Sequence, residues 1–276
     1  MGRKALFDLI QNSKADKTDL AEKFKSDYIY TLEHLEDDYT PSKSFKPSSI
    51  KCIRSGVYQC LGVPQDDTKQ SQVLYEICQN GTNTHLSIQE NVCKMGFGWK
   101  YEDVGQYVKD NNIDLEIIEP SDFEHGVYET KLYNKKYNVR FLCDGIVSYT
   151  NKRGKKEYMI FEIKTCGSGK FYPMKDVLEE HKQQAICYCI LLKLDKVLFF
   201  YSERDMLSKK AFIYEPTKKE KEELIKKLEY GNKCVENKII PKKPNSANNR
   251  FCAYCQYQSR CNNDGADECE ANIWVV

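Results

Sequence analysis

The sequence has almost no net charge and no long apolar segment. Its 276 residues include 42 Lys or Arg and 41 Asp or Glu, which leaves a formal net charge of +1. This balance excludes a globally basic, histone-like binder of nucleic acid, although it does not exclude a local basic cleft. The longest apolar run, Ala185–Leu192, has eight residues, far fewer than the roughly 20 that a membrane-spanning helix needs. We therefore expect no membrane partner.

Signals for export and for lipid attachment are also missing. The first residues, Met-Gly-Arg-Lys-Ala-Leu, contain no apolar stretch for a signal peptide, and Leu6 stands where myristoylation needs Ser or Thr. With 41% hydrophobic and 12% aromatic residues, the chain is too apolar to be disordered. We expect a soluble, globular, cytoplasmic protein of a bacterium or of a phage-infected host cell.

Hydrophobic periodicity predicts helices at both ends of the chain and strands in its middle. Apolar residues at helical spacing among Lys, Asp and Glu predict a charged helical N-terminal extension over residues 1–47. Helices are predicted near 48–57, 69–93, 173–194 and 216–236, and strands near 115–118, 126–133, 138–149, 157–165, 196–201 and 211–214. This order predicts one α+β domain over residues 48–262, with a central mixed β-sheet flanked by helices. An acidic and apolar tail follows over residues 263–276.

Asp144 and the pair Glu162-x-Lys164 are the most informative polar residues of the strand region. Side chains at i and i+2 of a strand share a face, so Glu162 and Lys164 point together. If residues 138–149 pair antiparallel with residues 157–165, Asp144 can lie across from Glu162 on that face. Two carboxylates on a half-buried face are costly unless something binds them, and hard oxygen ligands suit Mg²⁺ or Mn²⁺. A solvated cross-strand salt bridge explains the same residues without a metal.

Three further polar residues complete an ordered set. Gly81-Thr-Asn-Thr-His85 places a histidine on a helix before the strands, and Gln184 and Tyr188 lie four residues apart on one helical face after them. Each is ordinary by itself. In the order Gly-Thr-x-x-His, Asp, Glu-x-Lys and Gln-x-x-x-Tyr, however, the set resembles the RecB-like branch of the PD-(D/E)xK nucleases.

Thirteen cysteines are unusually many for a chain of this length. Disulfides are disfavoured in the cytosol, and most free cysteines pack as small hydrophobic residues. The spacing Cys252-x₂-Cys255-x₅-Cys261 is different, because thiolates this close together select zinc or an iron–sulfur cluster. A fourth ligand is needed. Cys52 is the best candidate, with Cys60 and Cys269 as rivals.

One cysteine about two hundred residues before a Cys-x₂-Cys-x₅-Cys group resembles the iron–sulfur branch of the same nucleases, which includes the CRISPR-associated adaptation exonucleases and the AddB nuclease domain. The resemblance covers roughly Ser48–Cys261 and implies a restriction-endonuclease-like PD-(D/E)xK core. It also implies that the C-terminal cysteines are stapled to an N-terminal helix by a [4Fe–4S] cluster. The implied cluster ligands are Cys52, Cys252, Cys255 and Cys261. Zn²⁺ through the same thiols is the alternative.

The resemblance implies a metal-dependent DNA exonuclease that hydrolyses phosphodiester bonds of single-stranded DNA or DNA ends. Recombination, repair, or phage- or CRISPR-related processing would be its setting, with a recombination or replication protein as partner. The implied residues are His85, Asp144, Glu162 and the backbone carbonyl of Ile163 for Mg²⁺ or Mn²⁺, Lys164 with Glu162 and Asp144 for catalysis, and Gln184 and Tyr188 for DNA. Two alternatives stay open: a non-catalytic nucleic-acid-binding or assembly subunit with this fold, and a zinc-stapled structural protein.

Overall fold

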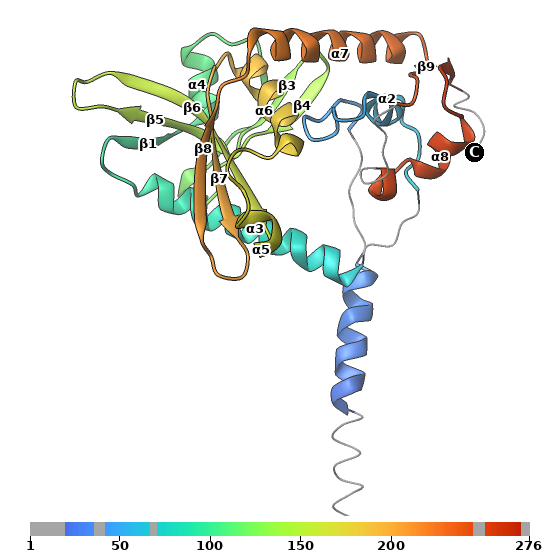
Figure 1. Ribbon diagram of the computed structural model, residues 1–276, viewed down its shortest axis with the longest axis horizontal. Helices are drawn as coiled ribbons and strands as arrows, with labels where there is room; N and C mark the ends of the chain where they lie inside the picture. Colours follow the sequence, from blue (N-terminus) through green and yellow to red (C-terminus); the bar gives the residue numbers. More distant parts are fainter. Residues whose placement is uncertain (1–19, 36–41, 67–70, 245–251, 272–276) are drawn as a thin grey trace, which may run out of the picture. The chain divides into compact units, whose positions relative to one another are not determined.

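The computed structural model describes residues 20–35, 42–66, 71–244 and 252–271 (Figure 1). The chain forms two compact units. Met1–Tyr39 and Asp67–Asn80 make up the first, and Thr40–Asp66 and Gly81–Val276 the second. In the first unit, residues 20–33 are helical, within the predicted charged helix. All residues with predicted chemistry belong to the second unit.

A five-stranded mixed sheet, in the order β1-β5-β6-β7-β8, lies at the centre of the second unit. Its strands are β1 (Trp99–Glu102), β5 (Gly145–Thr150), β6 (Lys156–Cys166), β7 (Val197–Glu203) and β8 (Lys209–Tyr214). β6 and β7 are parallel, and every other neighbouring pair is antiparallel. A parallel pair needs a crossover connection, which α5 (Ser168–Phe171) and α6 (Glu179–Leu192) supply. The predicted central mixed sheet is confirmed.

Helices cover the sheet on both faces, because its central strands are apolar on both sides. On one face, Ile88 of α3 (Gln72–Cys93) packs with Phe161 and Ile163 of β6. The larger core lies on the other face and draws on α2 (Ile53–Leu61), α6 and α7 (Lys218–Glu236). Figure 1 shows α7 running across α2 and α6, against both of which it packs. Side chains that alternate along β6 therefore point into two different layers, as predicted.

The predicted single strand over residues 138–149 is wrong, because the structure divides it into two strands in different sheets. β4 (Val139–Leu142) pairs with β3 (Lys131–Asn134) in a three-stranded antiparallel sheet, whose third strand is β2 (Glu116–Glu119). β5 pairs instead with β1 and β6. The chain thus changes sheets at Cys143 and Asp144. Two short helices, α4 (Val104–Asp110) and η1 (Phe123–His125), precede this region.

Segments near both ends of the described chain pack in the same unit. Phe45, which falls in the predicted N-terminal extension, is fully buried, and its N–H donates to the Asn138 carbonyl at 2.8 Å. The C-terminal elements are β9 (Ile239–Ile240), η2 (Cys252–Tyr254), α8 (Gln258–Asn263) and β10 (Cys269–Glu270). β10, from the predicted tail, pairs antiparallel with β9. Within the described ranges, no helix combines the length and the apolar character needed to cross a membrane.

Candidate metal centre and cysteine group

Asp144 lies where the chain passes from β4 to β5, one residue before the paired part of β5. The first β5 residue, Gly145, pairs with Phe161, so Asp144 is next in register to Glu162. The Asp144 Oδ2 atom accepts a hydrogen bond from the Ile163 N–H at 2.6 Å. The predicted opposition of Asp144 and Glu162 agrees with this register. Ile163, predicted to offer its backbone carbonyl to a metal, places its side chain in the opposite layer.

The backbone at Asp144 is held by buried polar groups. The Tyr101 hydroxyl donates to the Asp144 carbonyl oxygen at 2.5 Å, and Gln89 Nε2 donates to the same oxygen at 2.8 Å. Gly145 permits this approach, because a Cβ there would come within 2.5 Å of the Tyr101 hydroxyl oxygen. These hydrogen bonds from Tyr101 of β1 and Gln89 of α3 hold the Asp144 backbone, and so they fix where its carboxylate lies.

Helix α3 brings His85 to Asp144. The His85 Nδ1 atom lies 3.2 Å from Asp144 Oδ1, and both side chains are half-buried. Burial alone would lower the pKa of His85, but the hydrogen bond and the negative charge of Asp144, with a smaller effect of Glu162, outweigh it and raise that pKa. The predicted meeting of this histidine with the carboxylates agrees with the structure.

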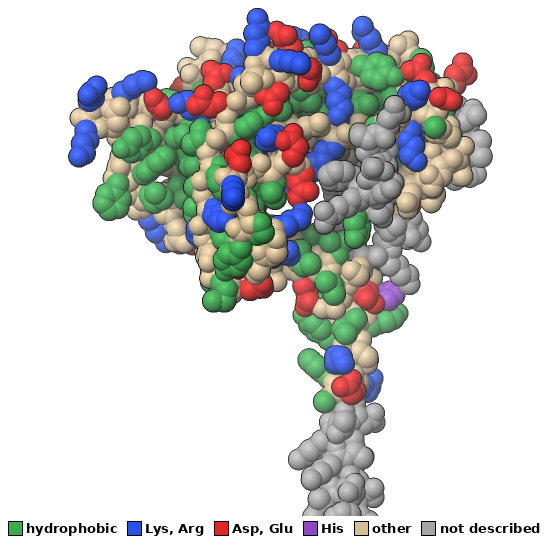
Figure 2. Space-filling view, in the orientation of Figure 1, with side chains coloured by type: hydrophobic (Ala, Val, Ile, Leu, Met, Phe, Trp, Pro, Cys, Tyr) green, Lys and Arg blue, Asp and Glu red, His purple; other side chains and the backbone are tan. Residues whose placement is uncertain are grey.

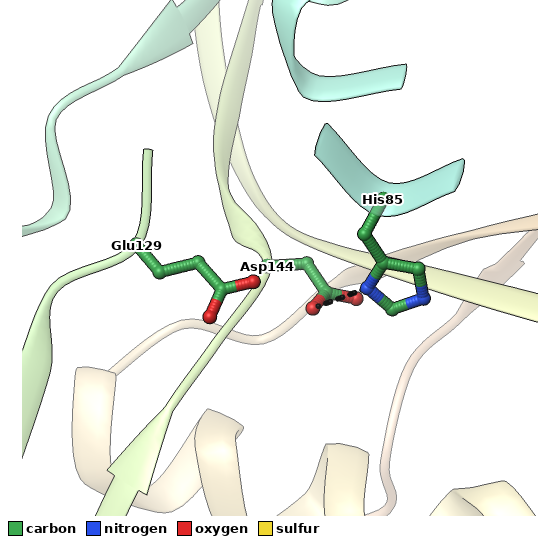
Figure 3. A group of neighbouring side chains, drawn as sticks. All are labelled: His85, Glu129 and Asp144. Carbon is green, nitrogen blue, oxygen red and sulfur yellow. Dashed lines mark hydrogen bonds and ion pairs between the residues drawn. The ribbon is translucent and has the colours of Figure 1, made fainter. Parts of the chain in front are cut away.

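Glu129 also reaches this centre, although nothing in the sequence pattern indicates it. Figure 3 shows its carboxylate beside Asp144, with His85 on the far side of Asp144. One ligand atom from each of His85, Glu129 and Asp144 lies within 4.8 Å of the other two. Burial and the charge of Asp144 raise the pKa of Glu129. The residue precedes β3 and follows no recognisable spacing, so only the tertiary structure reveals it.

Gln89 joins Glu129 to the same group. It lies one turn after His85 on α3 and is fully buried. Its Nε2 atom donates to Glu129 Oε1 at 3.3 Å as well as to the Asp144 carbonyl. Its amide oxygen is buried and has no hydrogen-bond partner among the residues that the structure describes. The centre therefore contains a buried oxygen that is left unsatisfied.

Glu162 and Lys164 form a buried ion pair beside Asp144. Glu162 is 2% exposed, and its Oε1 atom lies 2.5 Å from Lys164 Nζ. Burial raises the pKa of Glu162 to about 7, and the charge of Asp144 adds to this while Lys164 opposes it. Burial lowers the pKa of Lys164, but the charges of Glu162 and Asp144 outweigh it and raise that pKa. Lys164 therefore stays protonated.

Gln184 and Tyr188 continue this network away from the carboxylates. Gln184 Oε1 accepts from Lys164 Nζ at 3.0 Å, and Gln184 Nε2 donates to the Tyr188 hydroxyl at 2.8 Å. The Tyr188 hydroxyl in turn donates to the Leu142 carbonyl at 2.7 Å. Tyr188 is 3% exposed, which disagrees with the predicted contact between its side chain and a DNA backbone. Its position instead lets it hold Gln184, and through Gln184 the ammonium of Lys164.

The predicted cysteine ligands come from opposite ends of the second unit. Cys52 is the N-cap of α2, so the helix predicted near residues 48–57 begins only at Ile53, and the Ser49 hydroxyl donates to the Lys46 carbonyl at 2.9 Å. Burial raises the pKa of the Cys52 thiol, and the Cys255 and Cys252 thiols raise it further, while the Ser55 and Arg54 N–H groups lower it. Burial raises the pKa of the Cys261 thiol, Arg54 and Lys243 lower it, and Cys52 and Cys255 raise it by smaller amounts. Cys52 therefore interacts electrostatically with all three C-terminal thiols.

The two rival cysteines have other neighbours. The Cys60 Sγ atom lies 3.7 Å from Asn138 Nδ2, and burial raises the pKa of its thiol to about 12. The Cys269 thiol donates to the Asp264 carbonyl at 3.7 Å. The electrostatic effects of Cys255 and Cys252 on the Cys52 thiol favour Cys52 as the fourth ligand, although Cys269 also lies near Arg54.

Arg54 lies beside the cysteine group and joins it to the C-terminal segment. Its side chain is fully buried. Nη1 donates to the Pro241 carbonyl at 3.0 Å and to the Asp267 carbonyl at 3.3 Å, and Nε donates to the Tyr58 hydroxyl at 3.0 Å. The Nη2 atom is buried and has no partner among the described residues. Arg54 also lowers the pKa of the nearby Cys261 thiol, against the larger effect of burial.

Comparison with known proteins adds little to this geometry. No family model matches the chain, and no curated protein matches it. Among solved structures, the one described as "Crystal structure of SSO0001" is similar, with 20% sequence identity and a TM-score of 0.44 over 88% of this chain and 96% of that one. The function must therefore be inferred from the residues of the site.

Proposed function

We propose that this chain is a divalent-metal-dependent nuclease that hydrolyses phosphodiester bonds of DNA, on a PD-(D/E)xK core of the RecB-like type. The supporting observation is that His85, Asp144 and the Glu162–Lys164 pair gather at one end of β5 and β6. The choice of DNA, and of exonucleolytic cleavage at single strands or ends, comes from the resemblance of the ordered motifs to that family.

The residues present fit Mg²⁺ or Mn²⁺. His85, Glu129 and Asp144 offer ligand atoms within 4.8 Å of one another, and Glu162 lies next in register to Asp144. Carboxylate oxygens suit these hard cations, and the imidazole favours Mn²⁺. Burial and the negative charge of Asp144 raise the pKa values of Glu129 and Glu162, so Lys164 alone does not supply all the positive charge that would favour the ionised carboxylates. A bound cation would supply it, beside the unsatisfied amide oxygen of Gln89.

The protein's own residues would orient the reaction. A divalent ion, when bound, supplies polarisation of the phosphodiester and a lower pKa for the attacking water. Lys164 is held by Glu162 and Gln184 and keeps its proton. It is therefore suited to donate hydrogen bonds to phosphate oxygens and to offset their charge in the transition state, rather than to act as a general base. Tyr188 and Gln184 keep its ammonium in place.

We further propose that Cys52, Cys252, Cys255 and Cys261 hold a [4Fe–4S] cluster that staples α2 to the C-terminal segment. Two observations support the fit. The Cys52 sulfur lies at the N-terminus of α2, where the Ser55 and Arg54 N–H groups lower the pKa of its thiol against the larger, raising effect of burial. The buried Nη2 atom of Arg54 lacks a partner among the described residues, and the sulfurs of an anionic cluster would provide an acceptor.

Zn²⁺ through the same four thiols is the alternative to the cluster, because thiolates at this spacing bind either zinc or iron–sulfur groups.

Digestion of 5′- and 3′-labelled single- and double-stranded DNA with Mn²⁺ or Mg²⁺ tests the activity. We expect cleavage by the wild type and a nearly complete loss in Lys164→Ala, with Mn²⁺ binding retained by calorimetry. Lys221→Ala is the matched control, because Lys221 is also half-buried and ion-paired, with Asp195 at 2.6 Å. A wild-type protein without activity, or near-normal turnover of Lys164→Ala, would refute the proposal.

Anaerobic purification tests the cluster separately. Four iron and four sulfide per chain, with visible absorbance, are the expected result. Stoichiometric zinc without iron would replace the proposed cluster by a zinc staple. The metal and sulfide content does not depend on cleavage, so the outcome of this measurement is independent of the nuclease assay.

A further inference from the structure

The turn between β5 and β6 carries a concentration of positive charge that the metal centre does not use. Lys152, Arg153 and Lys155 lie in the turn and Lys156 begins β6, and no acidic residue occurs between Asp144 and Glu157. We call these four residues the basic tip. Asn151 closes the turn, because its Oδ1 atom accepts hydrogen bonds from the backbone N–H groups of Arg153 and Lys155.

Half of this charge is available for a ligand. Lys155 pairs with Glu157 at 2.9 Å, and Lys156 pairs with Glu102 at 2.7 Å. Lys152 and Arg153 are exposed and make no ion pair with any residue in the described part of the chain. Two unpaired cations at the end of a closed turn attract an anion such as a phosphate.

An exposed aromatic residue lies next to the basic tip. Phe97 is 96% exposed, and its φ of 60° is in the left-handed region that bulky residues rarely adopt. The loop that carries it is fixed to the end of β5, because the Thr150 N–H donates to the Gly98 carbonyl at 2.8 Å. A Cβ on Gly98 would lie 2.4 Å from the Thr150 carbonyl oxygen, so the loop depends on glycine here.

Neither the exposure nor the backbone conformation of Phe97 is explained by the core. A left-handed conformation is unfavourable for a non-glycine residue, and a side chain in solvent gives no packing in return. Such strain persists where the surrounding structure imposes it, and it often marks a binding site. Beside Phe97, Trp99 and Tyr149 pair across β1 and β5 with ring centroids 4.8 Å apart.

Charge and aromatic surface lie together on one face. Figure 2 shows blue Lys and Arg side chains at the end of the β5–β6 hairpin, with green hydrophobic side chains next to them. Lys156 precedes Glu162 by six residues of β6, which places the basic tip about 20 Å or more from the metal centre at about 3.3 Å per residue. The tip is therefore a surface separate from that centre.

We propose that the basic tip and Phe97 form a binding site for single-stranded nucleic acid. Lys152 and Arg153 contact the phosphates, and Phe97 stacks on an unpaired base. A single strand fits better than a duplex, because a duplex keeps its bases stacked on each other, whereas exposed aromatic rings next to basic side chains bind unpaired bases. The proposal extends the proposed function, since a strand cut at the metal centre would span about six stacked nucleotides, at about 3.4 Å each, to reach the tip.

Fluorescence anisotropy with a labelled oligothymidine of about twelve nucleotides, in EDTA, measures this site without cleavage. We expect Phe97→Ala to weaken binding roughly tenfold with an unchanged salt dependence. The double variant Lys152→Ala/Arg153→Ala is expected to reduce the slope of log affinity against log salt by about 1.4, which is about 0.7 for each phosphate that the variant no longer neutralises. Circular dichroism checks that both variants fold.

Matched controls separate a specific site from general charge and apolar surface. Leu207→Ala removes another exposed apolar side chain from a left-handed position. Lys218→Ala/Lys219→Ala removes two exposed charges from the start of α7. Both controls are expected to bind like the wild type. Equal losses of affinity in the controls and the tip variants would overturn the site.

Two other outcomes would also overturn the proposal. One is a wild type that does not bind the oligonucleotide. The other is Phe97-dependent binding to vesicles of anionic lipid without oligonucleotide binding, which would assign the surface to a membrane. Failure of the proposed nuclease function gives a different result, because the oligonucleotide would then bind through the tip in EDTA but remain uncleaved in Mn²⁺.

Discussion

Replacing Arg54 by Met removes the buried cation that joins α2 to the C-terminal segment. Arg54 donates to the carbonyl oxygens of Pro241 and Asp267, which lie 187 and 213 residues further along the chain. Methionine fills part of the same volume but cannot donate a hydrogen bond. The Arg54→Met variant therefore leaves both acceptors without this partner, and the Nε bond to the Tyr58 hydroxyl is lost as well.

The expected loss in the free energy of unfolding follows from how deeply these hydrogen bonds are buried. A buried acceptor that loses its donor costs about 1–3 kcal/mol. The bond to Pro241 is buried and should lie near the upper end, while the bond to Asp267 is partly buried and should lie near the lower end. Tyr58 keeps its hydrogen bond to Asp264 at 2.8 Å and adds little. We expect a loss of about 3–4 kcal/mol, a large part of the roughly 5–15 kcal/mol typical of folded domains.

Urea unfolding followed by circular dichroism measures the free energy of unfolding. Arg54→Lys should recover only part of the loss, because an ammonium group lacks the fork of donors that reaches several acceptors. Arg153→Met, at an exposed arginine, should change stability by less than about 0.5 kcal/mol. Arg54→Met should also lose visible cluster absorbance faster than the wild type, since Arg54 lowers the pKa of the Cys261 thiol. A loss below about 1 kcal/mol would show that the reasoning about the two carbonyls is wrong.

Three further predictions concern the two proposed metal groups. Glu129→Gln should weaken Mn²⁺ binding in calorimetry by about tenfold or more, whereas Glu124→Gln, at an exposed site, should leave it unchanged. The pKa of His85 is raised in the folded protein. Protonation of His85 therefore adds to the stability of the metal-free protein, fully below about pH 6.5, and this added stability is lost as the pH rises through the raised pKa. Mn²⁺ must displace the same proton, so affinity should rise with pH, and His85→Asn should flatten both dependences in urea and calorimetric titrations. Cys255→Ser should abolish the cluster absorbance, while Cys93→Ser, at an exposed cysteine, should retain it in the visible spectrum.

Local patterns in the sequence predict the parts of the site that lie on one segment. The alternation along β6 separates Glu162 and Lys164 from Phe161 and Ile163, and the structure places these pairs in different layers. This works because side-chain direction in a strand follows from backbone geometry alone. The antiparallel pairing of Asp144 with the Glu162 region is also predictable, since a short polar turn joins the two strands.

Features that depend on how distant segments pack are not predictable in this way. The break between β4 and β5 at Asp144 arises because the two halves pair with different sheets. Tyr188 is buried where its hydroxyl meets the Leu142 carbonyl. The amphipathic pattern of its helix does not indicate which segment packs on that face. The helix predicted near residues 48–57 begins only at Ile53, with Cys52 as its N-cap, while the Ser49 hydroxyl bonds to the Lys46 carbonyl.

The sequence by itself determined the class of the chain, the polar face of β6, the ligand spacing of the C-terminal cysteines and the presence of a histidine upstream. Only the tertiary structure decided that Glu129 and Gln89 join His85 and Asp144, and that Phe97 lies beside the basic tip. The physical reason is that periodicity and spacing are properties of one segment, whereas a cation site or a binding surface is a set of distances between segments. Those distances are fixed by the packing of the whole core.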